Sequence, residues 1–402
     1  MLYTPEAFEP LTEARWSQRR ARRAIHEIVA DADAAMRGPK LLWRAHEWDG
    51  WHATSPMKNL YVGAAGLIWA LDALRRRGHA ETTLDVSALA LRTLELFRAR
   101  PDFLKGWKLP EPSESALFAG ETGILLVAWH LGPSHELENA LLERVRANVA
   151  NETDELFWGV PGTLHAAKAM FDATGDGRWR RAWIESADAL WSRRGQDRLW
   201  VQRLYGQESQ GLSASHGLVG NVLALLRGGK LLAPARRRAL VRDTNAVLAR
   251  TAVFDGNLAN WPHRVRPQLV SPDGQIRLQW CSGGAGIVVS AADYLEEELL
   301  LAGAELVWKA GPHGLDKGPC ICHGTAGNGY ALLKAFARTG DERWLARARR
   351  FAMHALEQVS RLRAARGRGR YSLWTGDAGV ALFAADCIGA RSSYPVLDSW
   401  VW

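Results

Sequence analysis

Two cysteines and one histidine carry the clearest chemical signal in this sequence. Cys281 stands in WCSGGAG, and Cys322 and His323 open CHGTAGN, 41 residues further along. Two thiolates and one imidazole are typical zinc ligands, and a set of three leaves the fourth tetrahedral position open, as in catalytic rather than structural sites. The alternative is that both cysteines are small buried hydrophobic residues, which is the usual state of a lone cysteine.

A repeated helix start helps to decide between these interpretations. An apolar or aromatic residue, G-x-x-G and about ten apolar-rich residues recur seven times along the chain. The copies are YVGAAGLIWAL (61–71), FAGETGILLVAW (118–129), FWGVPGTLHAAKAM (157–170), SHGLVGNVLALL (215–226), CSGGAGIVVSAA (281–292), CHGTAGNGYALL (322–333) and WTGDAGVALFAA (374–385). Such a repeat indicates one structural unit that stacks on copies of itself.

Equivalent positions of these repeats carry the reactive side chains. Two positions before the first glycine, four repeats have a bulky aromatic residue, whereas the other three have Ser215, Cys281 and Cys322. One position before that glycine, the fourth and sixth repeats have His216 and His323. If the repeats are equivalent in space, these residues meet at one end of the fold, which favours a zinc site with one ion per chain. Cys320 and Cys387 lie outside the equivalent positions, and we interpret them as ordinary thiols.

Each repeat extends past its glycines into a second helix. FDATGDGRW (171–179) and FARTGDERW (336–344) both place T-G-D after the first helix, where glycine ends one helix and aspartate suits the first turn of the next. Strand-like alternation is hard to find anywhere. The pattern therefore predicts an all-α fold, either a solenoid or a closed α/α toroid, and we favour the toroid of seven inner and seven outer helices. We expect residues 1–402 to form one domain, with 1–55 as an N-terminal helical extension that completes the ring.

Composition limits the classes of function. The chain has 402 residues, 47% of them hydrophobic, without a secretory signal or an apolar run long enough to span a membrane. Four cysteines do not form a disulfide framework, so we expect a cytoplasmic protein with reduced thiols. The net charge of +8 comes largely from arginine runs. These could attract phosphates, but no nucleic-acid-binding motif accompanies them, and we interpret them as solvated helix faces.

The motifs WCSGGAG, CHGTAGN and SHGLVGN, together with the seven G-x-x-G helices, resemble the lanthionine synthetase C-like family. This family includes the lanthipeptide cyclases and their stand-alone relatives, some of which bind glutathione. The resemblance covers the chain from about residue 60 and is closer to the stand-alone branch. It implies an α/α toroid with zinc held by Cys281, Cys322 and His323, in agreement with the set found from the repeats.

The resemblance also implies roles for four further residues. His216 corresponds to the active-site histidine, Arg277 to an arginine before the first zinc cysteine, and Glu155 to an acidic residue that is aspartate in the cyclases. Lys317 matches a lysine that the glutathione-binding relatives use. One departure is Ser282, where the cyclases have tyrosine and the eukaryotic relatives histidine, so that a proton donor is missing and ordinary peptide cyclisation is in doubt.

Simpler interpretations exist for each of these residues. His216 could be a hydrogen-bonded core histidine, Arg277 part of a surface salt bridge, and Glu155 a compensating charge at the positive end of its helix. Lys317 could be an ordinary loop lysine.

The chemistry implied by the resemblance is the addition of a thiol to dehydroalanine or dehydrobutyrine. Arg277 would stabilise the enolate, and His216 would protonate the α-carbon or take the thiol proton. The expected partners are a peptide or protein that carries dehydroamino acids, and glutathione or a peptide cysteine as the thiol.

Three other functions compete with this one. A lanthipeptide cyclase would act on a dedicated precursor peptide, and a non-catalytic toroid would bind peptides or glutathione around a structural zinc. An α/α-barrel glycosidase would need two carboxylates at the mouth of the ring, and Glu155 has no evident partner there.

Overall fold

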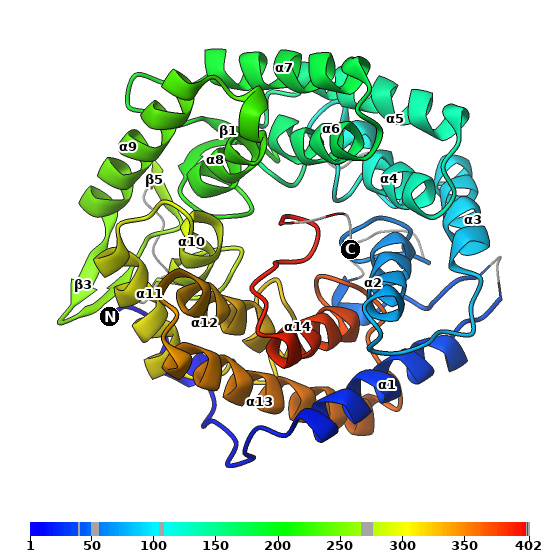
Figure 1. The fold of residues 1–402 in the computed structure, drawn as a ribbon, viewed down its shortest axis with the longest axis vertical. Helices are drawn as coiled ribbons and strands as arrows, with labels where there is room; N and C mark the ends of the chain where they lie inside the picture. The colour runs from blue at the N-terminus through cyan, green and yellow to red at the C-terminus, as the bar shows by residue number, and fades with distance from the viewer. Residues whose placement is uncertain (39–40, 50–55, 104–107, 267–275, 399, 401–402) are drawn as a thin grey trace.

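Two concentric rings of helices form the molecule (Figure 1), a computed structural model that describes residues 1–38, 41–49, 56–103, 108–266, 276–398 and 400. Within these residues there are fourteen α-helices, so the predicted α/α toroid is confirmed. The inner ring contains α2 (Ala64–Arg76), α4 (Glu121–Leu131), α6 (Val160–Thr174), α8 (Leu218–Arg227), α10 (Gly284–Ala291), α12 (Thr325–Thr339) and α14 (Asp377–Gly389). The outer ring contains α1 (Gln18–Ala34), α3 (Val86–Ala99), α5 (His135–Ala147), α7 (Gly177–Ser192), α9 (Pro234–Thr251), α11 (Glu297–Ala310) and α13 (Glu342–Arg366).

Short elements connect the helices. The 3-10 helices are η1 (Pro5–Ala7), η2 (Glu47–Asp49), η3 (Ser113–Ser115), η4 (Asn148–Ala150) and η5 (Gly229–Leu231). The strands β1 (Gln202–Leu204), β2 (Gln207–Gly211) and β5 (Arg264–Arg266) form one antiparallel sheet in the order β1-β2-β5, and β3 (Val253–Asp255) pairs with β4 (Leu258–Asn260). These strands have three to five residues, which is too short to produce a clear alternation in the sequence.

The inner ring is closed rather than a solenoid. Each inner helix contacts the next one along the chain, and α14 contacts α2, which joins the last repeat to the first. The N-terminal helix α1 lies in the outer ring, where it packs on its neighbour α13 and on the inner helix α14 (Figure 1). Residues 39–40 and 50–55 of the predicted N-terminal extension lie outside the described residues. None of the helices in the described ranges is long and apolar enough to cross a membrane.

The T-G-D junctions form as predicted. Gly175 and Gly340 end α6 and α12 with φ of 67° and 70°, a left-handed conformation that glycine adopts without a steric penalty. Asp176 and Asp341 then cap the next helices, because their carboxylates accept hydrogen bonds from the backbone N–H groups two residues later.

The equivalent positions before the glycines meet around a circle at one end of the inner ring. The backbone N–H of Cys281 donates to the carbonyl of Cys322 at 3.1 Å. The backbone N–H of Cys322 donates in turn to the carbonyl of Trp374 at 3.0 Å. The backbone N–H of Trp374 donates to the carbonyl of Tyr61 at 3.2 Å, and that of Tyr61 donates to the carbonyl of Phe118 at 3.1 Å. Direct backbone hydrogen bonds thus join neighbouring repeats, and the circle places the two cysteines side by side.

The second glycine of each motif lets the chain fold back tightly before the helix starts. A Cβ atom on Gly286 would lie 1.8 Å from the carbonyl oxygen of Trp280, and one on Gly327 would lie 2.0 Å from that of Ile321. No side chain fits at such distances. The glycines therefore belong to the architecture that positions the residues before them.

Candidate functional site

A cavity of about 490 Å³ opens where the inner helices begin. This volume lies in the range of small-molecule sites. Six of the seven predicted site residues line it, and these are Cys281, Cys322, His323, His216, Arg277 and Lys317. The seventh, Glu155, is fully buried behind His216. Residues separated by more than 100 positions in the sequence therefore share one space.

Cys281, Cys322 and His323 form a compact set of metal-ligating atoms. Their two sulfurs and one ring nitrogen all lie within 4.8 Å of one another. Cys322 and His323 are buried and Cys281 is half-buried, so one side of the set faces the cavity. Two thiols and one imidazole suit zinc, and three ligands leave a coordination position for a substrate. Among the described residues, no other group of three such side chains has this spacing.

Each of the two sulfurs has a polar neighbour. Gln279 Nε2 donates to Cys281 Sγ, and the Tyr61 hydroxyl lies against Cys322 Sγ, both at 2.9 Å. Hydrogen bonds from Cys322 and then Gln279 lower the pKa of Cys281, whereas burial raises the pKa of Cys322. Burial also lowers the pKa of His323 to about 3, which keeps its imidazole in the neutral form that binds metals.

His216 and Glu155 form a hydrogen-bonded pair. His216 Nδ1 lies 2.5 Å from Glu155 Oε2. Burial disfavours the charged imidazole, but the Glu155 carboxylate and its hydrogen bond outweigh it, so that the pKa of His216 is raised. Glu155 also accepts the backbone N–H groups of Phe157 and Trp158, at 2.9 and 2.5 Å. It thus stabilises the turn before its helix and orients the histidine as well.

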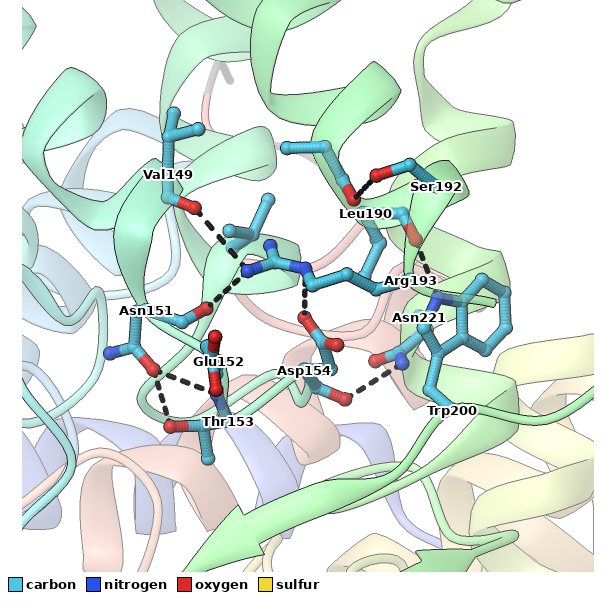
Figure 2. A network of polar contacts seen from close by, with 12 residues as sticks. Val149, Asn151, Glu152, Thr153, Asp154, Leu190, Ser192, Arg193, Trp200 and Asn221 are labelled. Carbon is cyan, nitrogen blue, oxygen red and sulfur yellow. Dashed lines mark hydrogen bonds and ion pairs between the residues drawn. The ribbon is translucent and has the colours of Figure 1, made fainter. Parts of the chain in front are cut away.

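Figure 2 shows the polar network that holds the loop before Glu155. Arg193, at the end of α7, lies 3.1 Å from the carboxylate of Asp154 and donates to the carbonyl of Asn151 at 3.0 Å. Asn221 of α8 donates to the carbonyl of Asp154 at 2.8 Å. The loop is therefore bound to two helices, and these contacts fix the position of the Glu155 carboxylate that follows it.

Arg277 and Lys317 supply positive charge at the cavity. Arg277 is exposed, and within the described residues the structure records no ion pair of its guanidinium. The surface salt bridge suggested for it therefore has no partner in those ranges. Lys317 is 40% exposed, with Nζ at 3.9 Å from the Asp316 carboxylate. Both cations line the cavity and can attract an anionic ligand.

Sequence reasoning missed His263, which also lines the cavity. Its Nδ1 lies 2.9 Å from the hydroxyl of Ser282. Burial, followed by the charges of His216 and Arg277, lowers the pKa of His263 to about 3, so the imidazole is neutral. In the sequence, His263 directly follows Asn260-Trp261-Pro262 in the long segment before the fifth repeat, and no repeated motif marks it as a site residue.

The N-terminal segment was missed as well. Thr4, Ala7 and Phe8 line the cavity, and the Phe8 ring stacks on His313 with 4.4 Å between centroids. Much of the remaining wall is aromatic. Its members are Tyr61, Phe103, Phe118, Phe157, Trp158, Tyr205, Trp280 and Trp374. The cavity therefore joins an apolar wall to a cationic and metal-ligating one.

Comparison with known proteins identifies the family of this chain. Residues 54–397 match the family model described as lanthionine synthetase C-like protein. The chain is 29% identical over 209 residues to a zebrafish (Danio rerio) protein, glutathione S-transferase LANCL1, a match that covers 50% of this chain and 47% of the relative. It is 32% identical over 128 residues to LanC-like protein GCL1 of Arabidopsis thaliana, which covers 29% of each chain.

A solved structure named nisin cyclase has the same fold. It superposes with a TM-score of 0.58 at 14% identity, and the alignment covers 92% of this chain and 94% of the other. The matches to the two curated relatives span less than half of their length. The family model, by contrast, covers most of this chain, and the resemblance noted in the motifs is confirmed. The protein described here belongs to the lanthionine synthetase C-like protein family.

Proposed function

We propose that the protein is a zinc-dependent enzyme that adds a thiol to dehydroalanine or dehydrobutyrine residues of peptides or proteins and forms a thioether. Glutathione is the thiol that we favour, in line with the name of the zebrafish relative. The observation that carries the proposal is that two thiols and an imidazole lie at one cavity with a paired histidine and an arginine.

Cys281, Cys322 and His323 would hold the ion. A free thiol has a pKa of about 8.5 and is mostly protonated at neutral pH. Zinc bound to this set would lower the pKa of a substrate thiol at its open position, while two thiolate ligands balance the charge of the ion. These ligands must be free thiols, as the structure has them, so we also propose a reducing compartment such as the cytoplasm.

His216 and Arg277 would serve the other half of the reaction. The thiol first loses its proton to solvent, and its sulfur bonds to the β-carbon. The electron pair of the double bond moves towards the carbonyl oxygen as an enolate, and a proton then reaches the α-carbon. The exposed guanidinium of Arg277 would offset the enolate charge. Because Glu155 raises the pKa of His216, it favours the imidazolium, which can donate that proton.

The two walls of the cavity suggest how the substrates bind. Lys317 would pair with a carboxylate of glutathione, while the aromatic wall would contact the peptide that carries the dehydroamino acid. A peptide cysteine in place of glutathione would make the same site a cyclase, and a toroid that only binds peptides or glutathione would form no new bond.

Mass spectrometry distinguishes these functions. The zinc-loaded protein is incubated with glutathione and a dehydroalanine peptide, and in parallel with a peptide that contains both dehydroalanine and cysteine. A glutathione adduct formed faster than in the absence of enzyme supports the proposal. Preferential ring closure of the second peptide would indicate a cyclase. Binding without acceleration of either reaction, over several peptides, would indicate the non-catalytic toroid.

A further inference from the structure

His263 stands on a segment that is fixed from several sides. Its carbonyl accepts a hydrogen bond from the backbone N–H of Leu212 at 3.0 Å, next to strand β2. Three residues earlier, Asn260 accepts the N–H of Gly284 at 2.6 Å and donates to the carbonyl of Arg277 at 3.2 Å. Between them, the Trp261 indole donates to the carbonyl of Leu248. These bonds tie the histidine to the turn that carries Cys281.

Ser282 fixes the imidazole itself. Ser282 is buried and sits in a tight turn, where it exchanges two backbone hydrogen bonds with Gln279, at 3.0 and 3.2 Å. Its hydroxyl lies 2.9 Å from Nδ1 of His263. This contact occupies Nδ1 and leaves Nε2 as the nitrogen that can meet a ligand in the cavity. Ser282 also lines the cavity, and its hydroxyl holds the His263 ring through this contact.

The surroundings of His263 keep it neutral. Besides burial, the positive charges of His216, Arg277 and Arg264 disfavour its protonation. A histidine of this kind is a poor base, but its remaining N–H is still a good hydrogen-bond donor. A neutral imidazole that polarises a carbonyl is an established device in enzymes that form enolates. If the hydroxyl of Ser282 donates to Nδ1, the ring proton resides on Nε2.

We propose that His263 is a further catalytic residue, whose Nε2–H donates to the carbonyl oxygen of the dehydroamino acid, and that Ser282 positions it. This inference rests on the proposed thiol addition. As the carbon–sulfur bond forms, the electron pair of the double bond moves to that oxygen, and the hydrogen bond from His263 strengthens. When the α-carbon takes its proton, the carbonyl re-forms, and His263 keeps its own proton throughout. The pair would supply the donor that the sequence lacks immediately after Cys281.

A double-mutant cycle tests this pair with kcat and KM for the dehydroalanine peptide. His263→Ala should lower kcat by about 100-fold, the effect of removing one oxyanion donor, with little change in KM. Ser282→Ala should lower kcat by about tenfold, and the double variant should be no worse than His263→Ala alone. His263→Gln, which retains an N–H donor, should recover part of the loss. His135→Ala, at a side chain that is 97% exposed, is the matched control and should behave as wild type.

Two further kinds of measurement distinguish a catalytic role of His263 from a merely structural one. Zinc content and melting temperature should stay at the wild-type values in all these variants. Nitrogen-15 NMR of labelled histidine, assigned by the signal missing in His263→Ala, should show a neutral ring protonated on Nε2, and this preference should weaken in Ser282→Ala.

Independent effects of the two substitutions, a His263→Ala enzyme as fast as wild type, or a ring protonated on Nδ1 would overturn the inference and leave the proposed function intact. A wild-type protein that forms no thioether would overturn the proposed function and this inference with it.

Discussion

Nδ1 of His216 lies 2.5 Å from Oε2 of Glu155, although 61 residues separate them in the sequence. The Glu155 carboxylate is completely buried, whereas the His216 imidazole lines the cavity. The negative charge of Glu155 therefore acts on the site through His216. The same carboxylate accepts two backbone N–H groups at the start of its own helix. One carboxylate therefore both binds the N–H groups at its helix start and pairs with His216.

Glu155→Gln should shift the pH dependence of turnover. The Glu155 charge raises the pKa of His216 above its ordinary value of 6.5, so the imidazolium is present below the raised pKa and is lost as the pH increases through it. Without this charge the basic limb of the kcat profile should move to lower pH, while zinc content stays the same. Glu152→Gln, on the exposed side of the same loop, is the control. Superimposable profiles for wild type and Glu155→Gln would show that the carboxylate does not tune the histidine.

His216→Ala should reduce kcat by about 100- to 10,000-fold, the usual contribution of a positioned acid–base group. The metal should stay bound, because His216 is outside the set formed by Cys281, Cys322 and His323. Steady-state kinetics together with metal analysis of the same sample check this. If zinc is lost in proportion to activity, His216 is a ligand or a structural support instead.

Replacing any one of the three proposed ligands by alanine should reduce zinc binding and abolish thioether formation. The ligand set would drop to two, which is too few for a stable tetrahedral site. Cys387→Ala removes another buried cysteine and is the matched control, since Cys387 lies in α14 outside the set. Metal content is measured by atomic emission after dialysis against a weak chelator. A fully loaded Cys281→Ala variant would remove Cys281 from the set.

Gly327→Ala should destabilise the fold through the inner ring. Its Cβ would lie 2.0 Å from the carbonyl oxygen of Ile321, so that the turn before α12 must move. We expect a loss of at least about 1–3 kcal/mol in the free energy of unfolding, as for overpacked cores. Gly177→Ala is the control, because its Cβ would meet only a flexible arginine at 3.6 Å, and it should be neutral or slightly stabilising. Equal stability of the two variants in denaturant melts would contradict this view of the motif.

The repeat made the architecture and part of the site predictable. A regular G-x-x-G start leaves a local signature in every copy, and equivalent positions in a closed ring must face one another. That is why Cys281, Cys322 and His323 could be grouped from the sequence although 41 residues separate the cysteines. The helix ends at Gly175 and Gly340 could also be predicted from the sequence, because a left-handed helix end favours glycine.

The remaining parts of the site depend on contacts that no local pattern records. His263 lies outside the repeat, and its bond to Ser282 arises only because the segment before the fifth repeat folds back onto the turn. The hydroxyl of Tyr61 reaches Cys322 across 261 positions, although the sequence marks Tyr61 only as one of four bulky aromatics. Phe8 enters the cavity from a segment that the repeats do not describe.

The most direct test of zinc-dependent thiol addition is a titration of metal-free protein with zinc. The initial rate of glutathione addition to a dehydroalanine peptide is followed by mass spectrometry while bound zinc is measured in the same samples. We predict that the rate rises in proportion to bound zinc and reaches its maximum at one ion per chain. A rate that does not depend on zinc, or a stoichiometric zinc protein that forms no adduct with any of several peptides, would contradict the proposed function.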